Sequence, residues 1–404
     1  MIKTEQFEIL LLPSLLFITS IIIFNSSYVK RVIQCHVQRF HLNKLIRAQA
    51  PKTNEAKEEE HHDKIILSGI FIHPIKSLRP ISVQSTTFNS LGLEGDRALM
   101  LVRPNPSSYS SFDIHKPTHR FLTQRQCPKL ATIDASLPTN INQSSDPKKT
   151  VIQLSHDDAQ QQNEKVFIDV SIQALRSYPV RYKAGLWDDV VDVVDVGDKA
   201  ASFIQSIIKS DDDSFDDLRV VSVIPNVTDR KTDDRYVPSA AYKLGKVPRV
   251  ALTDGFPILL ASEESLDALN ERLVKKDKKL LPMSRFRPNL VVKGLNKAFD
   301  EDEWKAIQIG GSDGPIFHVV KGCPRCKQSC TDQVTGERDV EPLETLKEFR
   351  ALGKNEEDVY FAQNVVLQPS AGFNRGDMSV YVGDEVRVLT RGTPIWDEDT
   401  VQAE

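Results

Sequence analysis

Residues 322–336 read GCPRCKQSCTDQVTG and hold three of the five cysteines of the chain. Soft thiolate ligands at this close spacing are typical of sites for thiophilic metals. Pro324 and Gly336 punctuate the stretch, which predicts a loop rather than the interior of a helix or strand. Arg325 precedes Cys326, and a neighbouring cation favours the thiolate form that binds metal.

The cysteine-rich stretch has three interpretations. His318 lies just upstream and, with Cys323, Cys326 and Cys330, gives the ligand count of a zinc site, although zinc ribbons usually spread two Cys pairs over a longer loop. The cysteines could instead be small buried hydrophobic residues. In the third interpretation a single cysteine binds a redox metal cofactor. The stretch alone leaves all three open.

Length and composition narrow the class of protein. The chain has 404 residues, which predicts two domains with additional segments. A hydrophobic share of 40% supports a sizeable core. The net charge of -4 gives no support for a nucleic-acid-binding protein. An odd number of cysteines, three of them clustered, favours a reducing compartment over a secreted disulfide framework.

A long apolar segment lies near the start of the chain. Residues 9–29 are 21 consecutive uncharged residues, and a helix needs ~20 residues to span a bilayer. Residues 1–29 are therefore predicted to be a transmembrane anchor. A cleaved signal peptide is the alternative, but the apolar length and the acidic Glu5 and Glu8 argue against it.

The charges after this segment predict its orientation. The basic residues Lys30, Arg31, Arg39, Lys44 and Arg47 follow the apolar run, and no acidic residue occurs between Ile9 and Glu55. By the positive-inside rule, the large C-terminal part should face the cytosol. The basic, acid-poor flank also fits mitochondrial targeting, so the mitochondrial outer membrane is expected, with the endoplasmic reticulum as the alternative. Residues 30–63 are predicted to be a solvated basic and acidic linker.

The remaining chain is predicted to be mostly β with some α, in two β-barrel-like domains behind the transmembrane helix. Short β-branched runs separated by turn signals predict a first barrel over residues 64–190. A second, also rich in strands, is predicted over residues 191–391, followed by a tail at 392–404. Helices are expected at Asp198–Lys209, from the Ser262 cap to about Lys275, and at Leu343–Leu352.

Four polar residues of the first domain stand at predicted strand ends or turns, where a rigid scaffold presents side chains. Ammonium, hydroxyl and guanidinium groups suit a phosphate-bearing ligand. Each taken singly could equally be ordinary surface charge. The four are Lys76, Ser77, Arg97 and Arg125.

Several short motifs together resemble one family. In chain order they are PIKS at 74–77, GDR at 95–97, TQRQ at 123–126, FRPN at 286–289, and RC at 325–326 with TG at 335–336; EPLETLK at 341–347 and FAQN at 361–364 extend the match. This order resembles MOSC-domain proteins that carry a MOSC N-terminal β barrel, over roughly residues 64–391. With the predicted anchor, the chain is similar to the amidoxime-reducing branch of that family.

The resemblance implies a molybdenum cofactor (molybdopterin) bound between the two domains. Cys326 matches the cysteine whose sulfur ligates molybdenum, and Cys326 and Asp254 are the catalytic residues that the resemblance implies. Gly255 and Phe256 depart from the family pattern, where small hydroxyl residues are frequent. The cofactor-binding residues that the resemblance and the strand-end pattern together give are Lys76, Ser77, Arg97, Arg125, Thr253, Arg287, Asn289 and Arg325.

The implied activity is the two-electron reduction of small N-hydroxylated substrates. The resemblance implies electrons from a membrane-bound b-type cytochrome and its NADH-dependent reductase, because the chain has neither a ferredoxin-type cysteine set nor a nucleotide fingerprint. Two other functions stay open. One is sulfur handling for, or carriage of, the molybdenum cofactor; the other is a zinc-stabilised, membrane-tethered interaction module.

Overall fold

The computed structural model describes residues 64–106, 116–137, 151–156, 165–209, 215–238, 248–369 and 378–397. The predicted anchor, residues 1–29, and the predicted linker, residues 30–63, lie outside the described residues. Among the residues that are described, no helix is long and apolar enough to cross a membrane. The described residues all belong to one compact unit that is mostly β with few helices.

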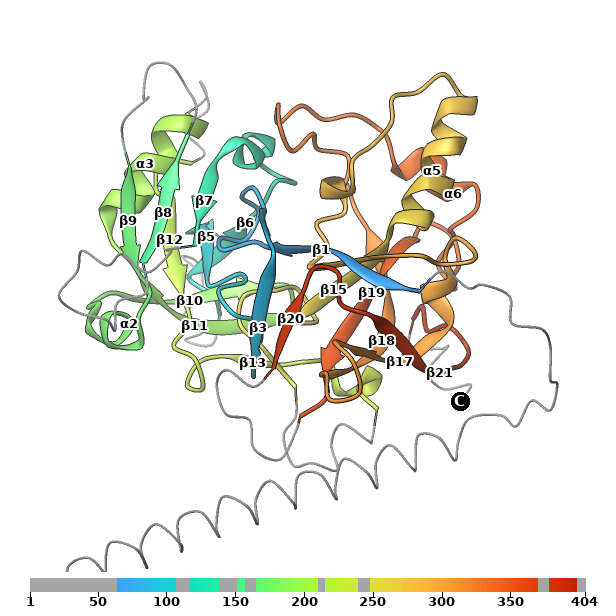
Figure 1. Ribbon diagram of the computed structural model, residues 1–404. Helices are drawn as coiled ribbons and strands as arrows, with labels where there is room; N and C mark the ends of the chain where they lie inside the picture. The colour runs from blue at the N-terminus through green and yellow to red at the C-terminus, as the bar shows by residue number, and fades with distance from the viewer. Residues whose placement is uncertain are drawn as a thin grey trace, which may run out of the picture. The chain divides into compact units, whose positions relative to one another are not determined.

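A closed five-stranded barrel forms the first part of the fold and confirms the predicted N-terminal barrel (Figure 1). It closes because β6 pairs in parallel with β10, joining the two ends of an otherwise antiparallel sheet. Its interior packs apolar strand residues such as Met100, Val193 and Val221. The strands, in sheet order, are β10 (Arg181–Leu186), β11 (Asp189–Asp195), β12 (Arg219–Ser222), β5 (Leu99–Pro104) and β6 (His119–Leu122).

A small three-stranded sheet and two helices pack beside this barrel. The sheet consists of β7 (Asp134–Ser136), β8 (Val151–Ser155) and β9 (Val166–Asp169). The predicted helix at Asp198–Lys209 is confirmed as α3 (Asp198–Ile208), whose buried Phe203 and Ile204 join a core with the sheet. The shorter α2 (Ile172–Ser177) begins where the Ser171 hydroxyl accepts a bond from the Ala174 amide.

The second part is an eight-stranded sheet. Its terminal strand β21 begins next to β1, because an isolated bridge joins Ile66 to Glu385. Two further backbone bonds, Leu67 N to Asp384 O at 2.8 Å and Val386 N to Ile65 O at 2.8 Å, strengthen this junction. The predicted second barrel is therefore a strongly curved sheet. In sheet order the strands are β2 (Ile81–Val83), β1 (Ile66–Ile72), β16 (Leu290–Lys293), β15 (Ile258–Ser262), β19 (Val359–Leu367), β18 (Ile316–Arg325), β17 (Trp304–Ile309) and β21 (Val386–Arg391).

Two helices cover part of this sheet (Figure 1). The predicted cap at Ser262 is confirmed: its hydroxyl accepts a bond from the Ser265 amide, and α5 runs over Glu263–Lys275. The second helix, α6 (Leu343–Lys347), is shorter than the predicted Leu343–Leu352. The remaining short strands are β3 (Ser85–Asn89), β4 (Gly92–Leu93), β20 (Ser379–Tyr381), β13 (Arg230–Lys231) and β14 (Arg249–Val250).

The two sheets do not follow the order of the chain. β1 and β2 come before the barrel strands, yet β1 pairs with β16 of the eight-stranded sheet. Conversely, β12 lies beyond residue 190 but pairs with β5 and β11 in the barrel. The two parts are therefore held together by exchanged strands as well as by side chains. The division predicted near residue 190 stays a prediction.

The prediction that the whole cysteine stretch is a loop was wrong for its first part. β18 continues through Gly322 to Arg325 along β19, with a register shift between Gly322 and Pro324. That irregularity lets a proline, which lacks a backbone donor, sit near the end of a strand. Cys326 is thus the first residue after a ten-residue strand, and its position is set by the sheet.

Candidate cofactor site

Cys326 lies at the end of β18, where the described structure brings an arginine from the barrel against it. The Arg125 guanidinium nitrogen Nη1 is 3.8 Å from the Cys326 sulfur. Arg125 follows β6, and its guanidinium carbon lies 4.2 Å from the centre of the Trp187 ring. A cation next to a partly exposed thiol is the environment in which a cysteine serves as a metal ligand.

The Asp254 side chain accepts hydrogen bonds from two other side chains. Its Oδ1 accepts a bond from Lys76 Nζ at 2.6 Å and one from the Trp187 indole at 2.9 Å. Lys76 Nζ also donates to the Leu252 carbonyl at 3.0 Å. Arg230 donates to the backbone oxygens of Thr253 and Asp254 and so holds the loop that carries them. The loop that carries Asp254 is therefore fixed by residues of both parts of the fold.

Arg97, Asn289 and Arg287 form a second group. Arg97 Nη1 donates to Asn289 Oδ1 at 3.1 Å, and its Nη2 reaches the Arg287 carbonyl at 3.4 Å. Asp96 forms an ion pair with Arg97 at 2.5 Å and accepts the His73 amide. Asn289 further accepts from the Leu259 amide and donates to the Phe71 carbonyl, which ties the group to β15 and β1.

A pair of glutamines joins these groups in the interior. Gln124 donates to the Ser77 carbonyl at 2.7 Å and to Gln333 Oε1 at 3.0 Å. The same Gln333 oxygen accepts from Arg287 Nη1 at 3.0 Å. Gln124 stands in the TQRQ motif, but nothing in the sequence indicated that Gln333, 209 residues away, would be its partner.

Four residues of the site have a left-handed backbone: Ser77 with φ 74°, Arg97 with φ 44°, Trp187 with φ 57° and Arg287 with φ 54°. Such conformations cost about 1–3 kcal/mol each for ordinary residues and cluster at functional sites. Among the described non-glycine residues, eight have a positive φ. Half of them lie at this one site, which argues that the chain folds to present these side chains.

Burial and charge shift the titration of the site. Burial, reinforced by the Arg97 charge, lowers the pKa of Arg287 to about 9, and burial lowers the pKa of Lys76. Arg287 remains cationic at neutral pH, and both side chains are poorly solvated. Desolvation acts to raise the pKa of Asp254, yet Lys76 and then Trp187 lower it more, and it ends below its usual range. Asp254 is therefore ionised at neutral pH.

Several buried donors at the site have no hydrogen-bond partner among the described residues. The atoms are Ser77 Oγ, Thr253 Oγ1, Thr331 Oγ1 and guanidinium nitrogens of Arg285, Arg287 and Arg325. A buried polar group without a partner costs about 1–3 kcal/mol. Hydroxyl and guanidinium donors are the groups that hold phosphate and other anions. The donor set, next to a soft thiol, therefore fits an anionic cofactor with a thiophilic metal.

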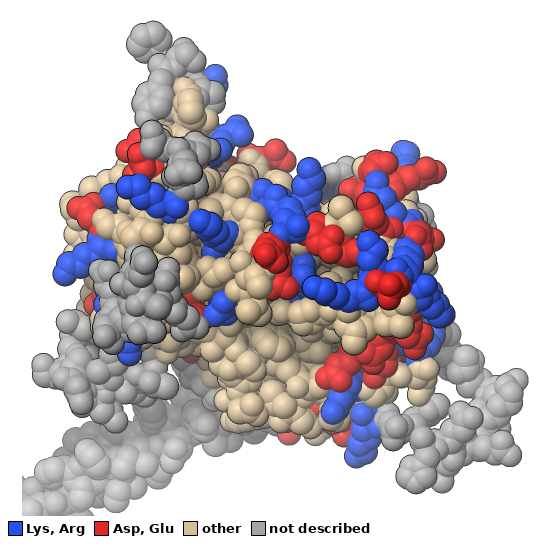
Figure 2. All heavy atoms as spheres, turned by 90° about the horizontal axis from the view of Figure 1, so that it is seen from above, with Lys and Arg blue, Asp and Glu red and all other residues tan. Residues whose placement is uncertain are grey.

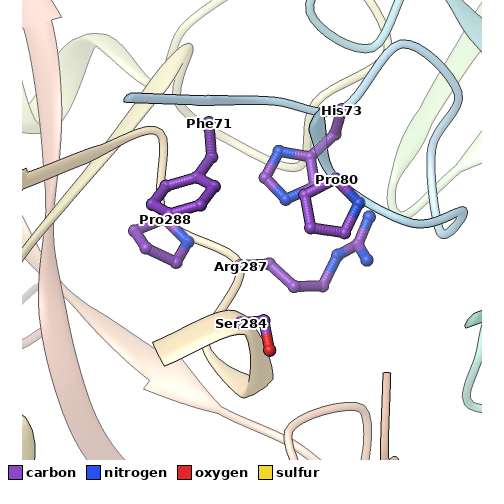
Figure 3. A pocket seen from close by; sticks show the side chains of 6 residues that line it. All are labelled: Phe71, His73, Pro80, Ser284, Arg287 and Pro288. Atoms are coloured by element: carbon purple, nitrogen blue, oxygen red, sulfur yellow. The ribbon is translucent and has the colours of Figure 1, made fainter. Parts of the chain in front are cut away.

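A small cavity of about 10 Å³ opens beside this donor set. Figure 3 shows the Arg287 side chain running between Ser284 and the rings of His73 and Pro80, with Phe71 and Pro288 at the other side. Burial, with Arg97 and Arg287, lowers the pKa of His73 well below its ordinary value, so its ring is neutral.

The surface charge of the molecule is mixed: Figure 2 shows Lys and Arg interleaved with Asp and Glu on the face it displays. At the site itself, the cations are buried (Lys76 and Arg287) or partly exposed (Arg97, Arg125 and Arg325).

Comparison with known proteins identifies the family. Residues 64–211 match the MOSC N-terminal beta barrel domain, and residues 247–387 match the MOSC domain. The mitochondrial amidoxime reducing component 2 of Rattus norvegicus is 31% identical over 299 residues, which cover 73% of this chain and 75% of that protein. The chain belongs to the MOSC-domain family.

Other members of the MOSC family show two kinds of relative. The mitochondrial amidoxime reducing component 2 of Bos taurus is 28% identical over 73% of this chain and 75% of its own length. A protein of Aspergillus terreus named molybdenum cofactor sulfurase is 34% identical over 148 residues, which cover 35% of this chain but only 17% of that protein. Both kinds are named for chemistry related to the molybdenum cofactor or to amidoximes.

The structure of this MOSC-family chain brings the predicted residues together, while their roles stay predictions. Direct contacts link Lys76 to Asp254, Arg125 to Cys326, and Arg97 to both Arg287 and Asn289. Ser77 joins through Gln124, and Thr253 through Arg230. Residues that the sequence reasoning missed are Gln124, Trp187, Arg230, Arg285 and Gln333. Trp187 lies ahead of the helix predicted at Asp198–Lys209, in a segment for which no element was predicted, and no sequence signal indicated its role.

The expected role of Arg325 beside Cys326 needs correction. Its Nη1 lies 3.0 Å from the Cys323 sulfur, and its Nη2 donates to the Phe286 carbonyl at 2.9 Å. Successive residues of an extended strand point to opposite faces, so adjacency in sequence does not bring the guanidinium to the Cys326 thiol. The cation in contact with Cys326 is Arg125.

The four residues of the zinc alternative do not form one cluster. His318 bonds to Gln368 at 3.1 Å within the core, and the Cys330 thiol donates to the Val340 carbonyl at 3.3 Å. No group of three or more His, Cys, Asp or Glu side chains able to hold a metal ion occurs among the described residues, which include all four. The three clustered cysteines thus have different partners: Cys326 contacts Arg125, Cys323 contacts Arg325, and Cys330 bonds to the Val340 carbonyl.

Proposed function

We propose that this chain is a molybdenum-cofactor-dependent reductase of small N-hydroxylated compounds. The observation that carries the proposal is the contact between Arg125 and Cys326 beside buried, unpartnered cationic and hydroxyl donors. The resemblance to proteins named amidoxime reducing component supports the choice of substrate class. In the proposal Cys326 is the sulfur ligand of the metal.

The cofactor-holding residues divide by chemistry. Ser77, Arg97 and Arg287, with Lys76 nearby, would bind the phosphate of the pterin through hydroxyl, guanidinium and ammonium donors. Asn289 positions Arg97, and Thr253 offers an unpartnered hydroxyl. Arg125 and Arg325 would bind the polar edge of the pterin. When bound, the cofactor supplies two-electron redox chemistry and an affinity for oxygen.

Asp254 would act on the substrate as a hydrogen-bond acceptor. Because Lys76 keeps it ionised, Asp254 can accept a bond from the N–H or O–H of an N-hydroxylated group and hold it beside Cys326. In the overall reaction the N–O bond breaks, two electrons and two protons are consumed, and an amine or amidine and water are released. The ionised Asp254 does not supply these protons, so solvent does.

The two electrons must come from outside the chain. We propose a b-type cytochrome as the donor, reduced in turn by an NADH-dependent reductase, and membrane attachment through residues 1–29 that keeps these proteins on one surface. The proposed location is the mitochondrial outer membrane, with the endoplasmic reticulum as the alternative and the described domains facing the cytosol. A glycan on Asn226, the asparagine of an Asn-Val-Thr sequon, would overturn that orientation.

Metal analysis and a donor-driven assay test the proposal. The full chain, purified in detergent, should contain molybdenum and a pterin phosphate, and should reduce benzamidoxime to benzamidine with reduced methyl viologen as electron source. Zinc in place of molybdenum, or molybdenum without reduction, would overturn the reductase. Release of sulfur from a persulfide on Cys326, with no N–O cleavage, would favour the sulfur-handling alternative that the Aspergillus terreus relative suggests.

A further inference from the structure

A hollow of about 190 Å³ lies on the barrel at the β10–β11 hairpin, beside the loop that carries Asp254. Its walls include Pro117, Phe121, Gly185, Trp187 and Val190. The lining thus combines two aromatic rings with charged side chains, since Arg120, Asp188 and Asp189 also line the hollow. Since an apolar cavity of about 150 Å³ can admit a benzene ring, the hollow has room for an aryl group.

Trp187 dominates this hollow. Its side chain is 52% exposed although tryptophan is usually well buried. Its backbone is left-handed, with φ 57°. Both features cost free energy, and an ordinary hairpin turn would avoid them with glycine or asparagine. The stability of the fold therefore does not explain a tryptophan at this position.

The Trp187 ring contacts two residues of the cofactor site. The Arg125 guanidinium lies against the ring at 4.2 Å and contacts the Cys326 sulfur at 3.8 Å. The indole N–H bonds to Asp254 at 2.9 Å. One guanidinium therefore separates the ring from the thiol, and Trp187 is a residue that both lines the hollow and contacts Asp254.

Polar groups in the lining of the hollow favour one class of ligand. Asp188 and Arg120 also line the hollow, and their side chains have no hydrogen bond or ion pair among the described residues, while Asp189 forms an ion pair with Arg230 at 2.6 Å. Aromatic rings stack well on planar groups, and tryptophan attracts planar cations. An aryl amidoxime, and the amidinium that its reduction yields, combines both properties.

We propose that this hollow is the subsite for the aryl group of an N-hydroxylated substrate and that Trp187 determines the preference for aryl over alkyl substrates. The inference rests on the proposed reductase function for the identity of the ligand. Trp187 binds the planar group, Asp188 faces the amidinium of the product, and Asp254 receives the nitrogen end.

Binding of benzamidine and of acetamidine tests this inference without turnover. Calorimetry on the cofactor-loaded full chain should show benzamidine binding that weakens about tenfold in Trp187→Ala, the effect expected for losing one stacked aromatic contact together with its buried area. Val190→Trp, which fills the hollow and leaves Trp187 in place, should weaken it as well. Phe167→Ala is the control, because Phe167 is an exposed aromatic residue of β9 outside the site.

Activity gives a second readout. The ratio of kcat/KM for benzamidoxime to that for acetamidoxime should fall about tenfold in both hollow variants, mainly through KM, and should stay unchanged in Phe167→Ala. Equal benzamidine affinity in the wild type, Trp187→Ala and Val190→Trp would overturn the inference. If the wild type reduces neither amidoxime but its benzamidine affinity depends on Trp187, the reductase proposal fails while the aryl site stands.

Discussion

Arg125 and Cys326 are 201 residues apart in the chain, and yet the Arg125 Nη1 atom lies 3.8 Å from the Cys326 sulfur. The arginine follows a barrel strand and the cysteine follows β18 of the curved sheet. The contact therefore joins the two parts of the fold at the thiol that we propose as the metal ligand.

Cys326→Ser should lose both molybdenum and N-reduction while the protein stays folded. Serine removes the soft thiolate but changes little else at a partly exposed position. Metal analysis, circular dichroism and the methyl viologen assay check the three expectations.

The matched control is Cys330→Ser, since Cys330 is buried and its thiol bonds to the Val340 carbonyl. This variant should keep much of the molybdenum and the activity. Complete loss of metal from both variants would instead indicate a site shared by several cysteines.

Arg287→Asn should stabilise the cofactor-free protein but weaken cofactor retention. Arg287 is a buried charge with one unpartnered nitrogen and a left-handed backbone, and asparagine tolerates that backbone better than most residues. The melting temperature of the apo form should rise or stay level, while the molybdenum content per chain falls severalfold. A drop in both quantities would mean that Arg287 is chiefly a structural residue.

Glu301→Gln should stabilise the protein at neutral and alkaline pH. Glu301 is fully buried among the hydroxyls of Ser262 and Ser265, and burial raises its pKa to about 7. The folded state therefore binds an extra proton between about pH 4.5 and 7, and stability falls as the pH rises through this window. Glutamine removes the buried charge, with a gain of up to about 3 kcal/mol at pH 8.

Denaturant titrations of the wild type and Glu301→Gln across pH 4 to 8 measure this gain, because other titrating groups cancel in the difference. The gain should vanish near pH 4, where the glutamate is protonated in both states. A difference that does not change with pH would contradict a buried, titrating Glu301.

His318→Gln should reduce the loss of stability in acid. His318 is buried and bonded to Gln368, and burial lowers its pKa to about 4. The unfolded chain then binds more protons than the folded one below pH 6.5, so stability falls as the pH drops toward 4. His318 alone accounts for about 2 kcal/mol of loss at pH 5.

Urea unfolding of His318→Gln and wild type at pH 7 and pH 5 checks this expectation. The stability difference between the two pH values should be smaller in the variant. An identical pH dependence would show that the pKa of His318 is the same in the folded and unfolded states.

Much of the local structure could be predicted from the sequence. The β-branched run before His73 forms β1. Ser262 caps α5, as a serine followed by two acidic residues predicts. The prediction was wrong for the start of the cysteine stretch, because pairing with β19 extends β18 past a proline. Turn residues in the local sequence cannot reveal this bulge, because the residues that flank it pair with Tyr360 and Gln363 of another strand.

The sequence by itself determined the strand and helix segments, the family and the set of polar residues at strand ends, because these depend on neighbours within a few positions. The tertiary structure alone decided which cation meets the Cys326 thiol, how Gln124 and Gln333 join the groups, and that Trp187 faces the site. These contacts depend on strands exchanged between two sheets, and a side chain's direction follows from its sheet register rather than from its neighbours in the chain.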